Sequence, residues 1–209
     1  NWAIYQAFMF AEAGSFEMYN ANMRTHVFDK LSAAEFVVFN RYDDSIDKMT
    51  LHKIVRGVSR GIQIAYEKAD GSVEYDEIED PLPYDINAPV IEIRDEDYAL
   101  FYRDLVEEQQ KYEGKTVSFR GIVARNDKMK AGTFAIGRHV MTCCVEDIRY
   151  AAVVAAWDRA EELQSRDWVK IRAKIQLRFS RVYGKKGPVL QVEELTRTTQ
   201  PEEPVATFY

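Results

Sequence analysis

The chain has 209 residues and a net charge of −6, and its 46% hydrophobic and 30% charged residues are typical of a folded globular protein, which excludes a disordered chain. It contains no run of 18 apolar residues, which excludes a helical membrane span, and its first residues lack the basic start and small-residue cleavage site of a signal peptide. Its two cysteines, Cys143 and Cys144, are neighbours that rarely bridge each other, so we expect a reduced, cytoplasmic protein with no membrane partner.

The charge is distributed unevenly along the chain. Residues 1–115 hold 12 Lys or Arg and 23 Asp or Glu, a balance of −11, whereas residues 116–209 hold 16 and 11, a balance of +5. This asymmetry favours two units with different partners, and an ordinary solvated surface is the alternative.

A helix–strand alternation is predicted for the N-terminal part. Apolar residues recur at three- and four-residue steps over 15–31 and 48–59, which predicts two helices, the first with Ser15 as its N-cap. Short runs rich in β-forming residues at 35–39 and 62–66 predict two buried strands. Such an alternation is typical of a parallel sheet, but two strands are too few for a stable one. We therefore expect this part to be incomplete or to pack on something else.

An acidic connection and a helix are predicted next. Residues 67–97 contain 12 acidic residues and three prolines, which indicates an extended, solvated linker, with cation binding as the alternative. An apolar stripe over 95–112, ended by Gly114, predicts a helix.

Beyond this helix the hydrophobic period changes from about 3.6 residues to two, which predicts strands. The clearest is 169–179, where apolar and polar residues alternate without a break before a hairpin turn at Tyr183–Gly187. Further strands are expected at 117–121, 134–143, 151–156 and 188–195, with a short helix at 157–164. Five strands with one or two short helices suggest a small OB-like β-barrel. We therefore divide the chain into residues 1–85 and an OB-like, β-rich domain with a leading helix over residues 86–209.

The motif Asn40-Arg41-Tyr42-Asp43 directly follows the first predicted strand, at the end where α/β sheets place ligands. In GTPases an Asn-Lys-x-Asp loop stands at this place, with its Asp accepting two hydrogen bonds from guanine and its Asn holding the loop and the base. Asn40 and Asp43 match that pattern, while Arg41 replaces the Lys that covers the base, a change that is not neutral. Because Asn and Asp also favour turns, an ordinary turn is the alternative.

A longer stretch around this motif resembles the later part of the GTP-binding domain of CobW-type GTPases. The similarity runs from Phe16 through the predicted helix to Phe36-Val-Val-Phe-Asn-Arg41 and continues through Leu51-His-Lys-Ile-Val-Arg-Gly-Val-Ser-Arg-Gly-Ile-Gln-Ile64. The resemblance implies that residues 1–85 are the C-terminal half of a P-loop GTPase-like parallel sheet, which makes the whole chain α+β. It further implies GTP as a ligand of the Asn-Arg-Tyr-Asp motif, a role in metal-cofactor homeostasis, and a metal-receiving protein as a partner.

Two parts of that family's machinery are absent from this sequence. No Gly-x-x-x-x-Gly-Lys-Ser/Thr occurs, and Gly184-Lys-Lys-Gly187 lies in a predicted hairpin rather than in a P-loop. The family's Cys-x-Cys-Cys metal motif is also missing. We therefore expect this chain alone not to be a GTPase, and GTP to be bound only in a complete protein whose preceding segment supplies the phosphate-binding loop. The first residue, Asn1 instead of Met, agrees with such a segment.

A second candidate site surrounds the two cysteines. His139, Cys143, Cys144 and Asp147 offer an imidazole, two thiols and a carboxylate, which are donors that Zn²⁺ prefers. Adjacent cysteines in a strand point to opposite faces, so both can face one metal only where the strand ends. Core packing of the thiols and a reactive thiol are the alternatives.

The region from about residue 90 onward resembles the soluble C-terminal domain of YcgQ-like proteins, which are partners of a permease. The similarity rests on Tyr112-Glu-Gly-Lys115, the cysteine pair followed by Asp147, Trp168-Val169 and the tail Pro201–Tyr209. This resemblance also implies a role in metal homeostasis, in agreement with a zinc site.

Basic residues follow the polar face of the long strand and its flanks: Arg166, Lys170, Arg172, Lys174, Arg178, Arg181, Lys185 and Lys186. On an OB-like barrel such a face is typical of single-stranded nucleic-acid binding, which also needs exposed aromatic residues. Phe179 falls on the apolar face of the predicted strand, and the protein is acidic overall, so we expect a solvated face and no nucleic-acid partner. The alternative function is a non-catalytic binding module, for a protein or a single-stranded nucleic acid, built on the OB-like domain.

Overall fold

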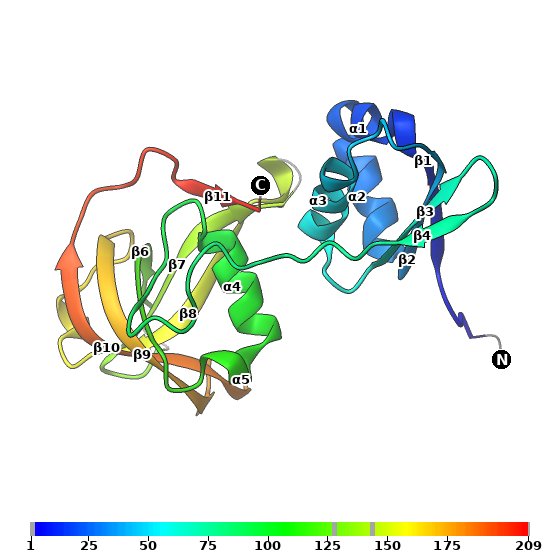
Figure 1. Cartoon of the computed structure of the whole chain (residues 1–209). Coiled ribbons are helices and arrows are strands. Elements are labelled where there is room, and N and C mark those ends of the chain that lie inside the picture. Colours follow the sequence, from blue (N-terminus) through cyan, green and yellow to red (C-terminus); the bar gives the residue numbers. More distant parts are fainter. Residues whose placement is uncertain (1–2, 127–128, 143–144, 209) are drawn as a thin grey trace. The chain divides into compact units, whose positions relative to one another are not determined.

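The computed structural model describes residues 3–126, 129–142 and 145–208. The predicted α+β class is confirmed in its general form, since the chain forms two sheets and has more strands than helices (Figure 1). The chain divides into two compact units. The first comprises the residues up to Asp80 together with Thr142 and Val145–Asp147, and the second comprises Pro81–Met141 and Ile148–Phe208. No helix in the described part of the chain is long and apolar enough to cross a membrane.

The first unit contains a four-stranded sheet in the order β1-β2-β3-β4. Its strands are β1 (Phe8–Glu12), β2 (Phe36–Tyr42), β3 (Gln63–Lys68) and β4 (Val73–Tyr75). The first three strands are parallel, and β4 returns antiparallel to β3. The expectation of only two strands is therefore wrong. Strand β1 escapes prediction because its short run Phe-Met-Phe-Ala contains no β-branched residue, unlike Phe-Val-Val-Phe in β2.

Three helices cover one face of this sheet (Figure 1). They are α1 (Ala13–Asn22), α2 (Arg24–Ala33) and α3 (Lys48–Val58). The helix predicted over 15–31 is broken at Met23, whose φ of −133° and ψ of 42° are not helical. Glu12 rather than Ser15 is the N-cap of α1, and the Ser15 hydroxyl donates a hydrogen bond of 2.9 Å to the Glu12 carboxylate. Phe16, Leu31, Phe39, Leu51 and Tyr66 form the centre of the core between helices and sheet.

The second unit begins with short elements that precede its main strands. They are β5 (Ile91–Glu92), α4 (Tyr98–Glu107) and α5 (Gln109–Tyr112). The helix predicted over 95–112 is divided at Glu108, whose φ of −116° and ψ of 47° interrupt the helical backbone. Helix α4 buries Tyr98, Phe101 and Leu105 against the strands that follow.

The main strands of the second unit are β6 (Thr116–Ala124), β7 (Thr133–Met141), β8 (Arg149–Ala156), β9 (Trp168–Ser180), β10 (Lys185–Arg197) and β11 (Val205–Thr207). Two 3₁₀ turns, η1 (Val145–Asp147) and η2 (Ala160–Glu162), flank β8. The sheet order is β11-β7-β8-β10-β9-β6-β5. Strand β6 also pairs with β7, so the pairing runs in a closed circuit through β6, β7, β8, β10 and β9. Strands β8 and β10 are parallel, and the other neighbours in this circuit are antiparallel.

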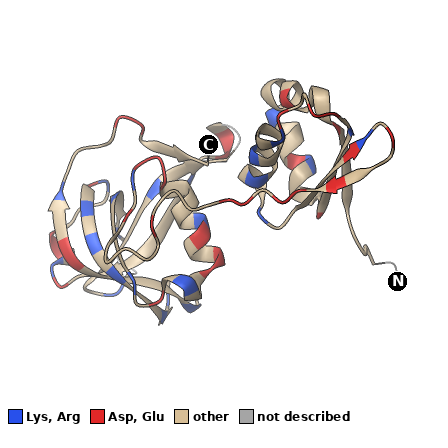
Figure 2. Ribbon diagram, viewed as in Figure 1, with Lys and Arg blue, Asp and Glu red and all other residues tan. Residues whose placement is uncertain are grey.

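Strand β9 carries the basic residues predicted from the sequence, and Figure 2 shows Lys and Arg recurring along it. Its side chains alternate between buried and exposed as predicted until Leu177, but Arg178 and Phe179 are then both exposed and Ser180 is buried. Phe179 therefore lies outside the core, with 68% of its surface exposed. The prediction that Phe179 lies on the apolar face is wrong because the alternation ends where the β9–β10 hairpin begins.

Candidate functional site

The predicted nucleotide-binding residues lie at the carboxyl end of β2, the strand between the two other parallel strands of the first unit. The pairing of β2 with β3 is irregular between Phe39 and Tyr42, and Arg41 has a φ of 53°, which a residue other than glycine rarely adopts. The carboxyl ends of the neighbouring parallel strands, at Glu12 and Lys68, lie at the same edge of the sheet. The fold therefore gathers side chains from three strand ends, where open α/β sheets bind ligands.

Arg41 reaches across two strand ends. Its Nη1 atom lies 3.2 Å from the Glu12 Oε1 atom, and the hydrogen bond from Ser15, followed by the bond from Arg41, lowers the pKa of the Glu12 carboxyl. The Arg41 side chain is 77% exposed, so this ion pair is screened by solvent and is weak. Glu12 at the end of β1 thus orients the Arg41 side chain, which nevertheless remains exposed to solvent.

Asn40 has an incompletely satisfied side chain. Its Oδ1 atom is buried and has no hydrogen-bond partner within residues 3–126, 129–142 and 145–208. A buried acceptor without a donor costs about 1–3 kcal/mol, so native structures rarely keep one without a reason. This oxygen is available to a donor group that reaches the edge of the sheet.

Asp43 begins the loop after β2. Its Oδ1 atom accepts hydrogen bonds from the Ser45 backbone N–H, at 2.8 Å, and from the Ser45 hydroxyl. These bonds, the hydroxyl first, lower the pKa of the Asp43 carboxyl, which is consequently ionised near neutral pH. The same bonds form an Asx turn. The sequence left open whether this loop is an ordinary turn or a binding loop with an exposed carboxylate acceptor, and the geometry is compatible with both.

A network of ion pairs that the sequence analysis missed lies at the same edge of the sheet, beside the end of β3. Lys68 Nζ lies 3.2 Å from Asp44 Oδ1 and 2.7 Å from Glu74 Oε1, and Lys48 also binds Glu74. The two lysines, Lys48 first, lower the pKa of Glu74 to about 2. Lys48 Nζ also lies 5.0 Å from the ring centroid of Tyr66, beside a cavity of about 470 Å³.

His52, to which the sequence analysis assigned no role, is fully buried on α3 between two carboxylates. Its Nδ1 atom lies 2.7 Å from Asp76 Oδ2 and its Nε2 atom 2.9 Å from Asp80 Oδ1. Arg56 lies within 3.6 Å of both carboxylates, and the Tyr66 hydroxyl donates to Asp76. The predicted solvated linker is therefore anchored at its start, since Asp76 and Asp80 bind cationic and aromatic side chains of the same unit. Only the folded chain reveals this, because His52 and its partners are more than 20 residues apart.

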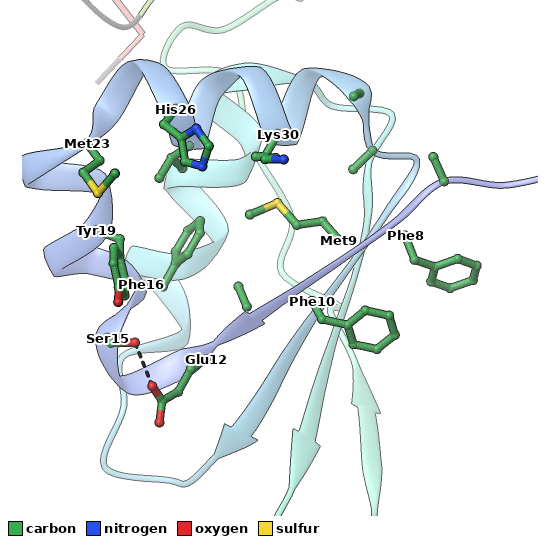
Figure 3. A pocket seen from close by; sticks show the side chains of 15 residues that line it. Phe8, Met9, Phe10, Glu12, Ser15, Phe16, Tyr19, Met23, His26 and Lys30 are labelled. Atoms are coloured by element: carbon green, nitrogen blue, oxygen red, sulfur yellow. Dashed lines mark hydrogen bonds between the residues drawn. The ribbon is translucent and has the colours of Figure 1, made fainter.

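A groove runs along the edge of β1 that no described strand occupies (Figure 3). It has a volume of about 760 Å³, and the side chains lining it on α1 and α2 include Tyr19, His26 and Lys30. Figure 3 shows Met9 toward the helices, whereas Phe8 and Phe10 lie on the opposite side of the strand. The groove is mainly apolar.

Of the four predicted metal ligands, the structure describes His139 and Asp147. His139 is exposed on β7, with its ring 5.7 Å from that of Tyr150. The Asp147 carboxylate accepts a hydrogen bond of 3.0 Å from the Thr142 backbone. Cys143 and Cys144 lie outside the described residues. Within the described ranges no three His, Cys, Asp or Glu side chains are arranged to hold a metal ion.

Comparison with known proteins identifies one family. The sequence pattern of the DUF1980 C-terminal domain matches residues 70–206, which agrees only loosely with the resemblance to YcgQ-like proteins. A search of curated proteins finds no match. One matching solved structure is a chain named as an aspartyl-tRNA synthetase from Leishmania major Friedlin, with 13% identity and a TM-score of 0.31. The match covers 51% of this chain but 20% of that one, and it supports no inference about function. Neither finding bears on the resemblance of residues 1–85 to CobW-type GTPases.

Proposed function

This chain belongs to the family of the DUF1980 C-terminal domain, and from that premise we propose that it joins this domain to a guanine-nucleotide-binding edge on β1, β2 and β3. In this proposal residues 1–80 form one half of a P-loop GTPase-like sheet and contribute recognition of the base. The preceding segment of a complete GTP-binding protein supplies the phosphate-binding loop, since this sequence contains no such motif.

Two features at the carboxyl end of the central parallel strand support the proposal: the buried Oδ1 atom of Asn40, which has no hydrogen-bond partner among the described residues, and the ionised carboxylate of Asp43. An acceptor without a donor fits a site completed by a ligand or by a loop that closes over it. The Asp43 carboxylate suits the two N–H groups at the edge of guanine, because an ionised acceptor forms stronger bonds than a neutral one. Arg41, exposed and weakly paired, can move from Glu12 to lie over the base.

The closed circuit of strands in the second unit supports the finer proposal of an OB-like barrel. Strands β6, β7, β8, β10 and β9 pair in a ring in which β8 and β10 are parallel, and closure removes the unpaired edges of a five-stranded sheet. We infer that this barrel is the non-catalytic part of the protein. A role in metal-cofactor homeostasis follows from the two resemblances and is part of the same proposal.

Base specificity tests the nucleotide proposal. NMR titration of the chain with guanosine and with xanthosine, in which a carbonyl replaces the 2-amino group of guanine, should show a preference for guanosine. Asp43→Asn should weaken guanosine binding about tenfold, because a hydrogen bond to a charged group contributes about 1.5–3 kcal/mol. The same substitution should strengthen xanthosine binding, because an amide side chain offers both a donor and an acceptor.

Asp44→Asn is the matched control, since Asp44 is the next residue and its carboxylate is bound to Lys68. Guanosine and xanthosine binding should be unchanged in this variant. Equal affinity for both nucleosides in the natural chain, or equal losses in the two variants, would refute base recognition by this loop.

A further inference from the structure

A second cavity, independent of the nucleotide-binding edge, lies in the second unit between the loop before β7 and the β9–β10 hairpin. We call it the hairpin cavity. It has a volume of about 1080 Å³. Small and apolar side chains of β7 and β8, among them Ala135, Val154 and Ala156, line it, and Arg125 and Lys130 contribute from the loop before β7. Arg178, Phe179, Arg181 and Val182 contribute from the hairpin.

The hairpin cavity is cationic. No Asp or Glu is among the described residues that line it, whereas two arginines of the hairpin and Lys130 are exposed and form no ion pair within residues 3–126, 129–142 and 145–208. Earlier along β9, by contrast, two basic side chains have carboxylate partners. Arg172 lies 3.4 Å from Glu193 and 3.1 Å from Glu194, and Lys170 lies 3.6 Å from Glu92. Lys170 and Arg172 of the basic stripe thus have carboxylate partners, whereas the charge of the hairpin arginines is left for an anion.

Phe179 presents an aromatic ring at this cavity with 68% of its surface exposed. The hairpin that carries it is fixed to the sheet by Tyr183. The Tyr183 hydroxyl accepts a hydrogen bond of 2.8 Å from the Val154 N–H and donates one of 3.0 Å to the Pro188 carbonyl. The Tyr183 ring also packs over Gly187, where a Cβ atom would lie 2.9 Å from it. The exposed ring is therefore held in place rather than carried on a free loop.

We propose that the hairpin cavity binds single-stranded nucleic acid. Unpaired Arg and Lys side chains contact the phosphates, Phe179 stacks on a base, and the small side chains of β7 and β8 leave room for that base. An acidic peptide would satisfy the cations but would leave the exposed ring without a planar partner. The sequence-based expectation of no nucleic-acid partner relied on the overall charge, which does not represent the local charge of this cavity, and on an apolar-face position of Phe179, which is exposed. The inference does not rest on the proposed nucleotide site, because it concerns other residues in the other unit.

Fluorescence anisotropy with labelled single-stranded DNA and RNA of about 12 nucleotides tests the proposal, since an OB fold covers about 4–16 nucleotides. The double variant Arg178→Gln/Arg181→Gln should bind about tenfold more weakly than the natural chain. The slope of log affinity against log salt between about 50 and about 200 mM should fall by about 1.4, because each phosphate contact to a single strand contributes about 0.7.

The matched control is Arg172→Gln/Arg197→Gln, which removes the same charge from two arginines that already have carboxylate partners. Its affinity and salt slope should equal those of the natural chain. Phe179→Leu keeps an apolar side chain but removes the stacking face, and should weaken binding about tenfold. Val106→Ala, which truncates an exposed apolar side chain of α4 outside the cavity, should not weaken it. Circular dichroism should show native unfolding temperatures for all four variants, since the changed side chains are exposed or half-buried.

Three results would overturn the proposal. One is the absence of oligonucleotide binding at low salt, and another is an equal loss in the cavity and control variants. The third is displacement of the oligonucleotide by polyglutamate at equal charge concentration together with an unchanged affinity of Phe179→Leu, which would make the cavity a site for acidic protein segments.

Discussion

Among the described elements of the first unit, no strand pairs with the outer edge of β1 and no helix covers the sheet face that carries Phe8 and Phe10, whereas the strands of the second unit pair in a circuit that returns to its start. Phe8, Phe10 and Tyr75 on the uncovered face are 52%, 65% and 68% exposed, although aromatic side chains contribute most when buried. In the second unit Phe119 and Phe134 of the circuit are buried, whereas Phe179 at the β9–β10 hairpin is exposed. A closed circuit needs no partner to satisfy its backbone, while an open parallel sheet depends on the layers and anchors packed against it.

We expect the largest loss of stability from a substitution that disrupts the closed strand pairing of the second unit. A Cβ atom at Gly137 on β7 would lie 2.0 Å from the Ala151 carbonyl oxygen of β8, and a backbone atom cannot move aside cheaply. Gly137→Val should lower the free energy of unfolding of the second unit by about 4 kcal/mol or more. Gly14→Ala in helix α1 is the control, because its Cβ atom would have an ordinary 3.9 Å contact. It should raise the melting temperature slightly. A calorimetric scan of both variants checks this, and a native-like scan for Gly137→Val would contradict the closed pairing.

The next effect concerns the anchor of the open sheet. His52→Ala removes the partner of two carboxylates, of which Asp76 has 1% of its side chain exposed. Although Arg56 remains within 3.6 Å of both carboxylates, the lost hydrogen bonds leave buried acceptors without a donor, which costs about 1–3 kcal/mol. Urea unfolding should show this loss in the first unit while the transition of the second unit is unchanged. His26→Gln, an exposed histidine on α2, should stay within about 0.5 kcal/mol of the natural chain. Equal effects of the two substitutions would show that His52 is not an anchor.

The pH dependence of the first unit provides a smaller test. Lys48 and Lys68 lower the pKa of Glu74 from 4.5 to about 2 in the folded chain. A carboxyl group whose folded pKa is depressed stabilises the fold above its unfolded pKa, and this stabilisation is lost as the pH falls from about 4.5 to about 2. Glu74→Gln should therefore flatten the fall of the urea midpoint within that window. Glu77→Gln, which changes an exposed carboxylate two residues from β4, should leave the profile unaltered.

The smallest expected effect lies on the uncovered face of the first unit. Phe10 lies on the uncovered side of β1, so Phe10→Ala should change the free energy of unfolding by less than about 0.5 kcal/mol. Phe39→Ala, on the covered side of β2 with no exposed surface, should cost about 3–5 kcal/mol. A comparable loss for both variants, measured by urea unfolding of the first unit, would mean that the face is covered in solution.

The prediction from the sequence succeeded where a pattern depends on neighbours in the chain. The alternation along β9 located that strand to within one residue at each end, because period-two burial appears directly in the sequence. It failed for β1, whose short apolar run lacks β-branched residues, and for the helix break at Met23, which no proline or glycine marks. The candidate loop at Asn40 was located correctly at the carboxyl end of a strand, while the lack of a partner for its buried oxygen appears only when the surrounding side chains are in place.

The sequence by itself therefore determined the alternation of elements, the end of β2 at which the Asn-Arg-Tyr-Asp motif lies, and the presence of a basic stripe on one strand. These features depend on residues a few positions apart. Only the tertiary structure decided that His52 joins Asp76 and Asp80, that Glu193 and Glu194 neutralise Arg172, and that Arg178 and Arg181 are left without acidic partners in the described part of the chain. The reason is that charge compensation and burial act over a few ångströms in space, and strand pairing brings together residues that are far apart in the sequence.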